Sequence, residues 1–165
     1  MEDSLDLCFR TLGGLLKQRE QTLQESNPVL QFEQRAENEK RKRRKLVQLE
    51  ERCGYYLQAI AVLIGREQLE KAMSLCSRKG SIIRYRCRTS GRSCYNVNGQ
   101  LEAYVIFDQD ETGGILFCSC YSFAQRYDQT QPYCKHLVAL RLSTALGNCL
   151  TVEVDDSEFA IYLNK

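Results

Sequence analysis

The spacing of hydrophobic positions divides the chain into a helical first half and a second half of mostly alternating pattern. Residues 5–16 and residues 46–64 repeat apolar side chains at steps of three and four, which predicts two amphipathic helices. Gly65 is a plausible stop for the second of them. A third helix is predicted through residues 69–76 and ends at Gly80. The N-terminal half is therefore expected to be helical.

Beyond these helices the period changes to the alternation typical of strands, in which successive side chains point to opposite faces. Asn98 and Gly99 are typical of a two-residue type I′ hairpin turn. Residues 137–146 return to a helical, apolar pattern that Gly147 can terminate. The alternation predicts antiparallel strands at residues 83–87, 95–97, 103–107 and 115–120.

These elements predict an α+β fold in which N-terminal helices precede an antiparallel β-meander and a final helix. The last residues are acidic, and we expect them to add only one helical turn, around Phe159. The sequence predicts four regions. They are an N-terminal helix with a charged arm at residues 1–45, a helical region at 46–80, a module of sheet and helix at 81–149, and an acidic tail at 150–165.

The composition favours a globular protein inside the cell. Hydrophobic residues make up 43% of the 165 residues and charged residues 27%. No stretch approaches the roughly 20 apolar residues of a membrane-spanning helix, and the acidic start is unlike a signal peptide. In a reducing compartment the nine cysteines are expected to be thiols or metal ligands rather than disulfides.

Four candidate metal ligands form two close pairs. Cys118 and Cys120 form a C-x-C motif at the end of the last predicted strand, where positions two apart point to the same side. Cys134 and His136 form a C-x-H motif. Two residues apart on a helix means a rotation of about 200°, so we expect Cys134 before the helix and His136 in its first turn. Three thiolates and an imidazole predict one closed, structural zinc site.

Two other interpretations of the motif stay open. His136, the only histidine of the chain, could be a core residue beside buried thiols, or the C-x-C pair could be redox-active. A catalytic zinc is not expected, because Asp128 is the only carboxylate between Cys118 and His136 and no residue is placed as a general base. We therefore predict no enzymatic activity and no small-molecule substrate.

Positive charge is concentrated in two segments, although the formal net charge is only +2. Residues 40–45 are an unbroken basic run within the polar residues 33–45, typical either of a nuclear localisation signal or phosphate-contacting arm, or of a solvated helix or linker. No acidic residue lies between Glu70 and Glu102. Four arginines of that interval lie beside Tyr85 and Tyr95 and form either a nucleic-acid surface or a solvated strand face: Arg84, Arg86, Arg88 and Arg92.

The order of strand, C-x-C, variable loop, C-x-H and helix resembles the SWIM zinc finger. Ala139, three residues after His136, gives a C-x-H-x-x-A ending similar to the SWIM-domain subunit of the Shu complex. The preceding helix, glycine and strands are also similar to that family, so the resemblance covers about residues 66–148. Tyr121 departs from it, since many SWIM modules carry proline there.

The resemblance implies a non-enzymatic accessory factor of homologous recombination that acts in the nucleus in DNA repair after DNA damage, often in meiosis. Such proteins pair as heterodimers with a RecA-like recombinase paralogue and help the recombinase assemble on single-stranded DNA. The resemblance also implies that residues 81–149 are the SWIM module, with a small Ala139 beside the zinc ligands Cys118, Cys120, Cys134 and His136.

Two other functions stay open beside this one. SWIM modules also occur in substrate adaptors of ubiquitin ligases, although the chain lacks the second cysteine and histidine cluster of a RING domain. A zinc finger that binds nucleic acid directly through its arginines is the other alternative. Neither alternative involves a membrane.

Overall fold

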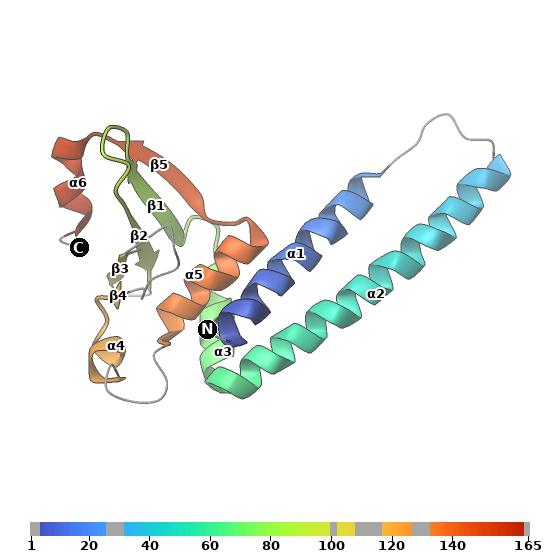
Figure 1. Cartoon of the computed structure of the whole chain (residues 1–165), viewed down its shortest axis with the longest axis horizontal. Helices are drawn as coiled ribbons and strands as arrows, with labels where there is room; N and C mark the ends of the chain where they lie inside the picture. Colours follow the sequence, from blue (N-terminus) through green and yellow to red (C-terminus); the bar gives the residue numbers. More distant parts are fainter. Residues whose placement is uncertain (1–3, 26–31, 100–101, 108–116, 127–132, 164–165) are drawn as a thin grey trace. The chain divides into compact units, whose positions relative to one another are not determined.

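The computed structural model of the chain describes residues 4–25, 32–99, 102–107, 117–126 and 133–163 (Figure 1). The chain divides into two units, residues 1–63 and residues 64–165, which are described separately. The α+β fold class is confirmed, because N-terminal helices precede a five-stranded sheet. None of the helices in these described ranges is long and apolar enough to cross a lipid bilayer.

The first unit is a hairpin of two antiparallel helices, α1 (Ser4–Gln24) and α2 (Phe32–Ile64) (Figure 1). The predicted helices are confirmed, and both are longer than their apolar stripes. The polar residues before Leu46 consist largely of strong helix formers, so they continue α2 as one element rather than forming a separate arm. The helices bury an apolar stripe each: Leu5, Phe9, Leu12 and Leu15 in α1, and Leu49, Cys53 and Ile60 in α2.

Part of the basic run secures the end of α1. The Lys42 ammonium donates hydrogen bonds to the carbonyl oxygens of Leu23 (3.0 Å) and Glu25 (3.1 Å). These carbonyls lie at the C-terminus of α1, where carbonyls lack helical partners and the helix dipole favours a cation. Lys45 pairs with the Glu25 carboxylate at 3.8 Å. Residues 40–45 therefore form part of a solvated helix, which is one of the conformations expected for this basic run.

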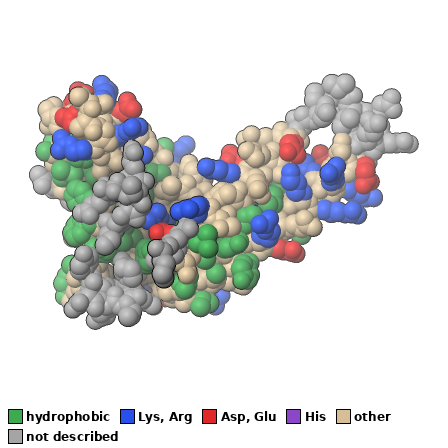
Figure 2. All heavy atoms as spheres, viewed as in Figure 1, with side chains coloured by type: hydrophobic (Ala, Val, Ile, Leu, Met, Phe, Trp, Pro, Cys, Tyr) green, Lys and Arg blue, Asp and Glu red, His purple; other side chains and the backbone are tan. Residues whose placement is uncertain are grey.

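Charged and apolar side chains separate along α2. Figure 2 shows Lys and Arg side chains gathered over its N-terminal half and hydrophobic side chains over its C-terminal half. Residues 40–45 supply most of the basic charge, and all but Lys42 are exposed. Among the side chains of α2 that the structure describes, the large exposed apolar ones are Val47, Tyr55, Val62 and Leu63.

The second unit is a mixed sheet with helices on it. Its strand order is β4-β3-β2-β1-β5, and β1 to β4 pair antiparallel, as predicted. The elements in chain order are α3 (Arg66–Cys76), β1 (Ile82–Cys87), β2 (Ser93–Asn98), β3 (Ala103–Phe107), β4 (Phe117–Cys118), α4 (Tyr121–Arg126), α5 (Lys135–Leu146), β5 (Leu150–Val154) and α6 (Asp156–Leu163).

The purely antiparallel meander is wrong at the C-terminal end. Residues expected in an acidic tail form β5, which pairs parallel with β1, and α6, which packs on the sheet. The segment Leu150–Val154 alternates and contains three β-branched residues, a strand signal that its acidic neighbours obscured. Of the strand predicted at residues 115–120, the described residues form only β4, at Phe117–Cys118, and α4 follows it.

The predicted two-residue turn at Asn98 and Gly99 is also wrong. Asn98 pairs with Ala103, so four residues separate the paired positions, and neither Asn98 nor Gly99 has the positive φ of a type I′ turn. The Gly99 amide instead donates to the Glu102 carbonyl at 2.8 Å. Glycine is needed there because a Cβ atom would lie 2.8 Å from that same oxygen.

The two faces of the sheet are buried in different ways. One face carries Cys87, Cys94, Val105 and Val154, which form a core with Phe159 of α6. The alternate positions, including Ile82, Val97 and Ile106, are buried on the opposite face. Tyr104 lies on this second face and stacks on His136, so α5 covers it. The candidate metal ligands lie on this α5 side.

Candidate metal centre

The C-x-C pair is held in place through the residue between the two cysteines. Cys118 ends β4 opposite Ile106 of β3. The Ser119 amide donates to the Val105 carbonyl at 2.9 Å, and the Ser119 hydroxyl accepts from the Val105 amide at 3.0 Å. This double clamp keeps Ser119 against β3, while Cys118 and Cys120 are both buried. The sequence offered no sign of the clamp beyond a small polar residue.

The chain turns into a helix immediately after this pair. The Cys120 carbonyl accepts hydrogen bonds from the amides of Phe123 (3.0 Å) and Ala124 (3.2 Å) in α4. The Phe123 amide also lies 3.4 Å from the Cys120 sulfur. A thiolate gains from such an amide donor at a helix start, because the helix dipole is positive there.

The C-x-H pair lies at the start of α5, as its spacing predicted. Cys134 is the N-cap, with extended backbone angles (φ −86°, ψ 164°), and His136 lies in the first turn. The Gln68 side-chain amide of α3 donates to the Tyr133 carbonyl at 2.7 Å. This bond ties the segment before Cys134 to α3 and orients the entry into α5.

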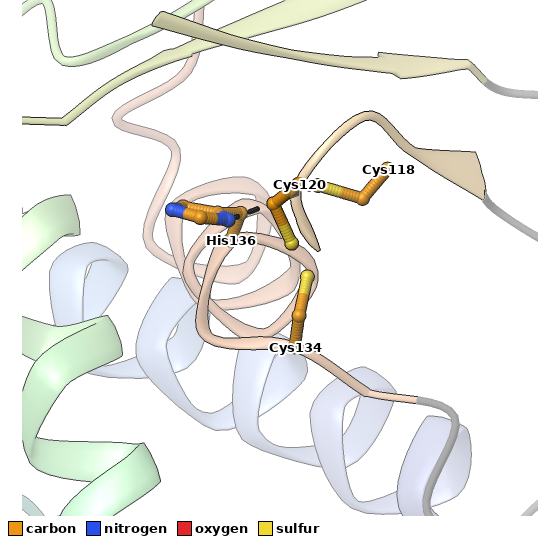
Figure 3. A group of neighbouring side chains, drawn as sticks. All are labelled: Cys118, Cys120, Cys134 and His136. Carbon is orange, nitrogen blue, oxygen red and sulfur yellow. Dashed lines mark hydrogen bonds between the residues drawn. The ribbon is translucent and has the colours of Figure 1, made fainter. Parts of the chain in front are cut away.

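The structure brings these four residues into one buried cluster (Figure 3). One pair comes from the end of β4 and the other from the start of α5. Their ligand atoms all lie within 4.8 Å of one another, and each residue is at most 3% exposed. The Cys118 sulfur lies 3.8 Å from His136 Nδ1. In a tetrahedral zinc site the distance between ligand atoms is about 3.4–3.8 Å, which follows from the metal–ligand bond lengths. The cluster could therefore hold a metal ion.

The cysteines of the cluster are hydrogen-bonded to one another and shift one another's pKa. Thiol hydrogen bonds from Cys118 and Cys134 hold the pKa of Cys120 far below its ordinary value. Hydrogen bonds with Cys120 and Cys134, together with burial, raise the pKa of Cys118. Neighbouring buried thiols of this kind suit a divalent metal, because metal binding displaces the thiol protons and leaves thiolate ligands.

Tyr104 supports the histidine in a way that the sequence did not reveal. Its ring stacks on the imidazole of His136 with a centroid distance of 4.0 Å and an interplanar angle of 25°. His136 Nε2 is buried and has no hydrogen-bond partner among the described residues, so stacking takes the orienting role that a hydrogen bond usually has. This geometry directs Nδ1 toward the sulfurs.

The arginines proposed for nucleic acid lie apart from the cluster and differ in their surroundings. Arg88 pairs with Asp155 at 3.6 Å, and Arg92 pairs with Asp156 at 3.2 Å. Arg84 lies 5.6 Å from the Tyr95 ring and donates to the Ser93 hydroxyl, whereas Arg86 is exposed on β1. The acidic C-terminal residues thus offset part of the positive charge that appeared in the sequence.

The two tyrosines of this segment face different sides of the sheet. Tyr85 stacks on Tyr162 of α6 at 3.9 Å, and Tyr95 lies on the opposite face under Arg84. They therefore do not form one stacking surface.

Comparison with models of protein families, with curated proteins and with solved structures found no match to this chain.

Proposed function

We propose that Cys118, Cys120, Cys134 and His136 bind one structural zinc ion. Three thiolates and one imidazole suit zinc better than magnesium or calcium, which prefer oxygen ligands. All four ligands come from the chain, so no coordination position is left for a substrate, as in structural rather than catalytic sites. The observation that carries this proposal is the convergence of the four buried ligand atoms within 4.8 Å.

In this proposal the ion joins the end of the sheet to the helix that covers it. The hydrogen bonds of Ser119 hold Cys118 and Cys120 beside β3, whereas Cys134 and His136 lie at the start of α5. Ala139 lies one turn further along α5 and is fully buried. A larger side chain there would push α5 away from its packing, and the ligand pairs would separate.

The chain in this proposal is a non-enzymatic accessory subunit of homologous recombination. It pairs with a RecA-like recombinase paralogue in the nucleus and promotes assembly of the recombinase on single-stranded DNA. The support is the agreement of the ligand pattern, the strand-to-helix placement and the small residue at position 139 with the SWIM resemblance. Single-stranded DNA is reached through the recombinase in this proposal, since Arg88 and Arg92 are paired with acidic residues.

The apolar side of α2 supplies the docking surface for this partner. Val62 is 84% exposed and Tyr55 is 68% exposed, although both side chains are large and apolar. They are seven residues apart, so they lie on the same side of the helix. Exposed aromatic and aliphatic side chains of this kind are typical anchors of protein interfaces.

The experiment that tests the proposal measures zinc and partner together. The full chain is purified from cells without added metal, zinc is quantified by mass spectrometry, and RecA-like chains among the co-purified proteins are identified. One zinc per chain and a RecA-like partner support the proposal. A folded protein without zinc contradicts the metal site, whereas a zinc-loaded chain that binds a cullin instead supports a ubiquitin-ligase adaptor.

A substitution at the surface separates docking from folding. Val62→Asp should abolish co-purification of the partner while zinc content and helicity stay unchanged, since the side chain is almost fully exposed. Asn38→Asp is the matched control, because it adds the same charge at a polar, exposed position of α2 that lies 24 residues before Val62 along the helix. Equal loss of the partner in both variants would argue against an apolar docking surface.

A further inference from the structure

β5 forms an edge of the sheet that no other strand covers among the described residues. It pairs only with β1, and Leu150, Thr151, Val152 and Glu153 are all exposed. Edge strands usually carry proline, a bulge or charged side chains, above all lysine, that prevent pairing with another chain, and the only charged residue of β5 is Glu153. β5 has the sequence Leu-Thr-Val-Glu-Val and contains neither proline nor lysine.

The backbone of β5 shows which groups face away from the sheet. The Arg88 amide donates to the Val154 carbonyl at 3.1 Å, so the main-chain groups of Val154 point toward β1. Main-chain groups alternate in direction along a strand, so those of Val152 also point toward β1. The amides and carbonyls of Thr151 and Glu153 therefore point outward, where they can bond to another strand.

We infer that β5 pairs antiparallel with β5 of a second copy, around a two-fold axis at Val152. In this register Thr151 lies opposite Glu153 of the other copy, and the two residues exchange both of their outward hydrogen bonds. Leu150 lies opposite Val154, and Val152 lies opposite itself. The two sheets then join into one continuous sheet.

The side chains of β5 suit this register. Leu150, Val152 and Val154 share one face, and two of them are large exposed apolar side chains, with Leu150 45% and Val152 41% exposed. Self-pairing brings these apolar residues together across the axis, which is the favourable cross-strand arrangement. The charged Glu153 meets a neutral threonine rather than its own copy, so no like charges face each other. The interface is thus self-complementary, as a two-fold dimer requires.

The test uses the full, metal-loaded chain and measures its mass by sedimentation equilibrium over a range of concentrations. A monomer–dimer equilibrium is expected for the unmodified chain. Thr151→Pro removes one outward amide from each copy and leaves the bonds to β1 intact, so it should raise the dimer dissociation constant about 30-fold. Thr151→Val keeps the amide and is the matched control, which should still dimerise. Circular dichroism reports whether each variant is folded.

A charge exchange at the axis tests the register independently of the proline. Val152→Lys and Val152→Asp each place like charges opposite each other, so each variant alone should be monomeric. An equal mixture of the two should form a heterodimer, because only Val152 faces its own copy. A chain that is monomeric at every concentration overturns the inference, and so does a dimer unaffected by Thr151→Pro or a mixture that stays monomeric.

Discussion

The helical hairpin and the sheet unit are stabilised by different kinds of contact. In α1 and α2 the buried side chains form continuous stripes, and ion pairs such as Arg19 with Glu50 (3.3 Å) lie at the surface. In the second unit the sheet has a small core under α6, and the Cys118–His136 cluster joins its other side to α5. None of the four clustered ligands comes from the hairpin, so metal dependence should be confined to the second unit.

Loss of the proposed zinc ion should have the largest effect and should distinguish the two units. Chelation, or the substitution Cys134→Ser, removes a binding free energy that is about 10–16 kcal/mol for structural zinc. We expect β4 and α5 to lose protection in amide hydrogen exchange by several orders of magnitude, while α1 and α2 keep theirs. Equal loss of protection in both units would show that they fold as one.

Cys149→Ser is the control for that substitution. Cys149 is half-buried and lies outside the cluster, at the start of β5. Removing its sulfur should leave zinc content and the exchange pattern unchanged. A zinc loss as large as that of Cys134→Ser would contradict the assignment of the ligands.

A cavity in the hairpin should destabilise α1 and α2 and leave the sheet unit unchanged, and the effect should be smaller than that of metal loss. Leu49→Ala deletes a side chain that is 5% exposed, which should destabilise the hairpin by about 2–4 kcal/mol. Val47→Ala, two residues away and 53% exposed, should change stability by less than about 0.5 kcal/mol. Hydrogen exchange of α1 and α2 checks the difference, and zinc content should not change in either variant.

The smallest expected effect concerns the contact between the β1–β2 turn and α6. Hydrogen bonds from Ser90 and Arg92 lower the pKa of Asp156 from 3.8 to about 2. A lowered pKa stabilises the folded state above the ordinary pKa, and this contribution is lost only as the pH falls through about 2. Asp156→Asn should therefore cause a small drop in the unfolding temperature that is the same at every pH from 5 to 8.

The proposed zinc ligands should behave differently over that same pH range. They bind metal only when deprotonated, so metal affinity should fall as the pH falls. The pH dependence of stability between 5 and 8 should thus persist in Asp156→Asn and disappear in Cys134→Ser. Glu158→Gln, which removes an exposed charge from the same helix, is the control for the effect of net charge.

Local signals predicted much of this structure correctly. Apolar spacing identified α1, α2, α3 and α5, and Gly147 ends α5 in the left-handed conformation expected of a helix stop. The sequence also predicted the grouping of Cys118, Cys120, Cys134 and His136. Residues two apart point to the same side of a strand but to different sides of a helix, which determined where each pair could lie.

Contacts between distant segments were not predictable in the same way. The parallel pairing of β5, the stacking of Tyr104 on His136 and the pairing of Arg88 with Asp155 join residues more than 30 positions apart. No local pattern encodes such a partner. The acidic tail and the arginine-rich segment each looked like a separate surface, although two of their charge pairs connect them.

The parallel pairing of β5 has a consequence for the order of folding. β1 pairs with β2 through a short turn, but Ile83 pairs with Leu150, which is 150 − 83 = 67 residues later. Closing such a long loop is slow because its entropy must be lost before any contact forms. The ligands at positions 118 to 136 lie inside this loop, so an ion bound early would shorten it. Metal capture should then speed refolding, with β5 as the last strand to join.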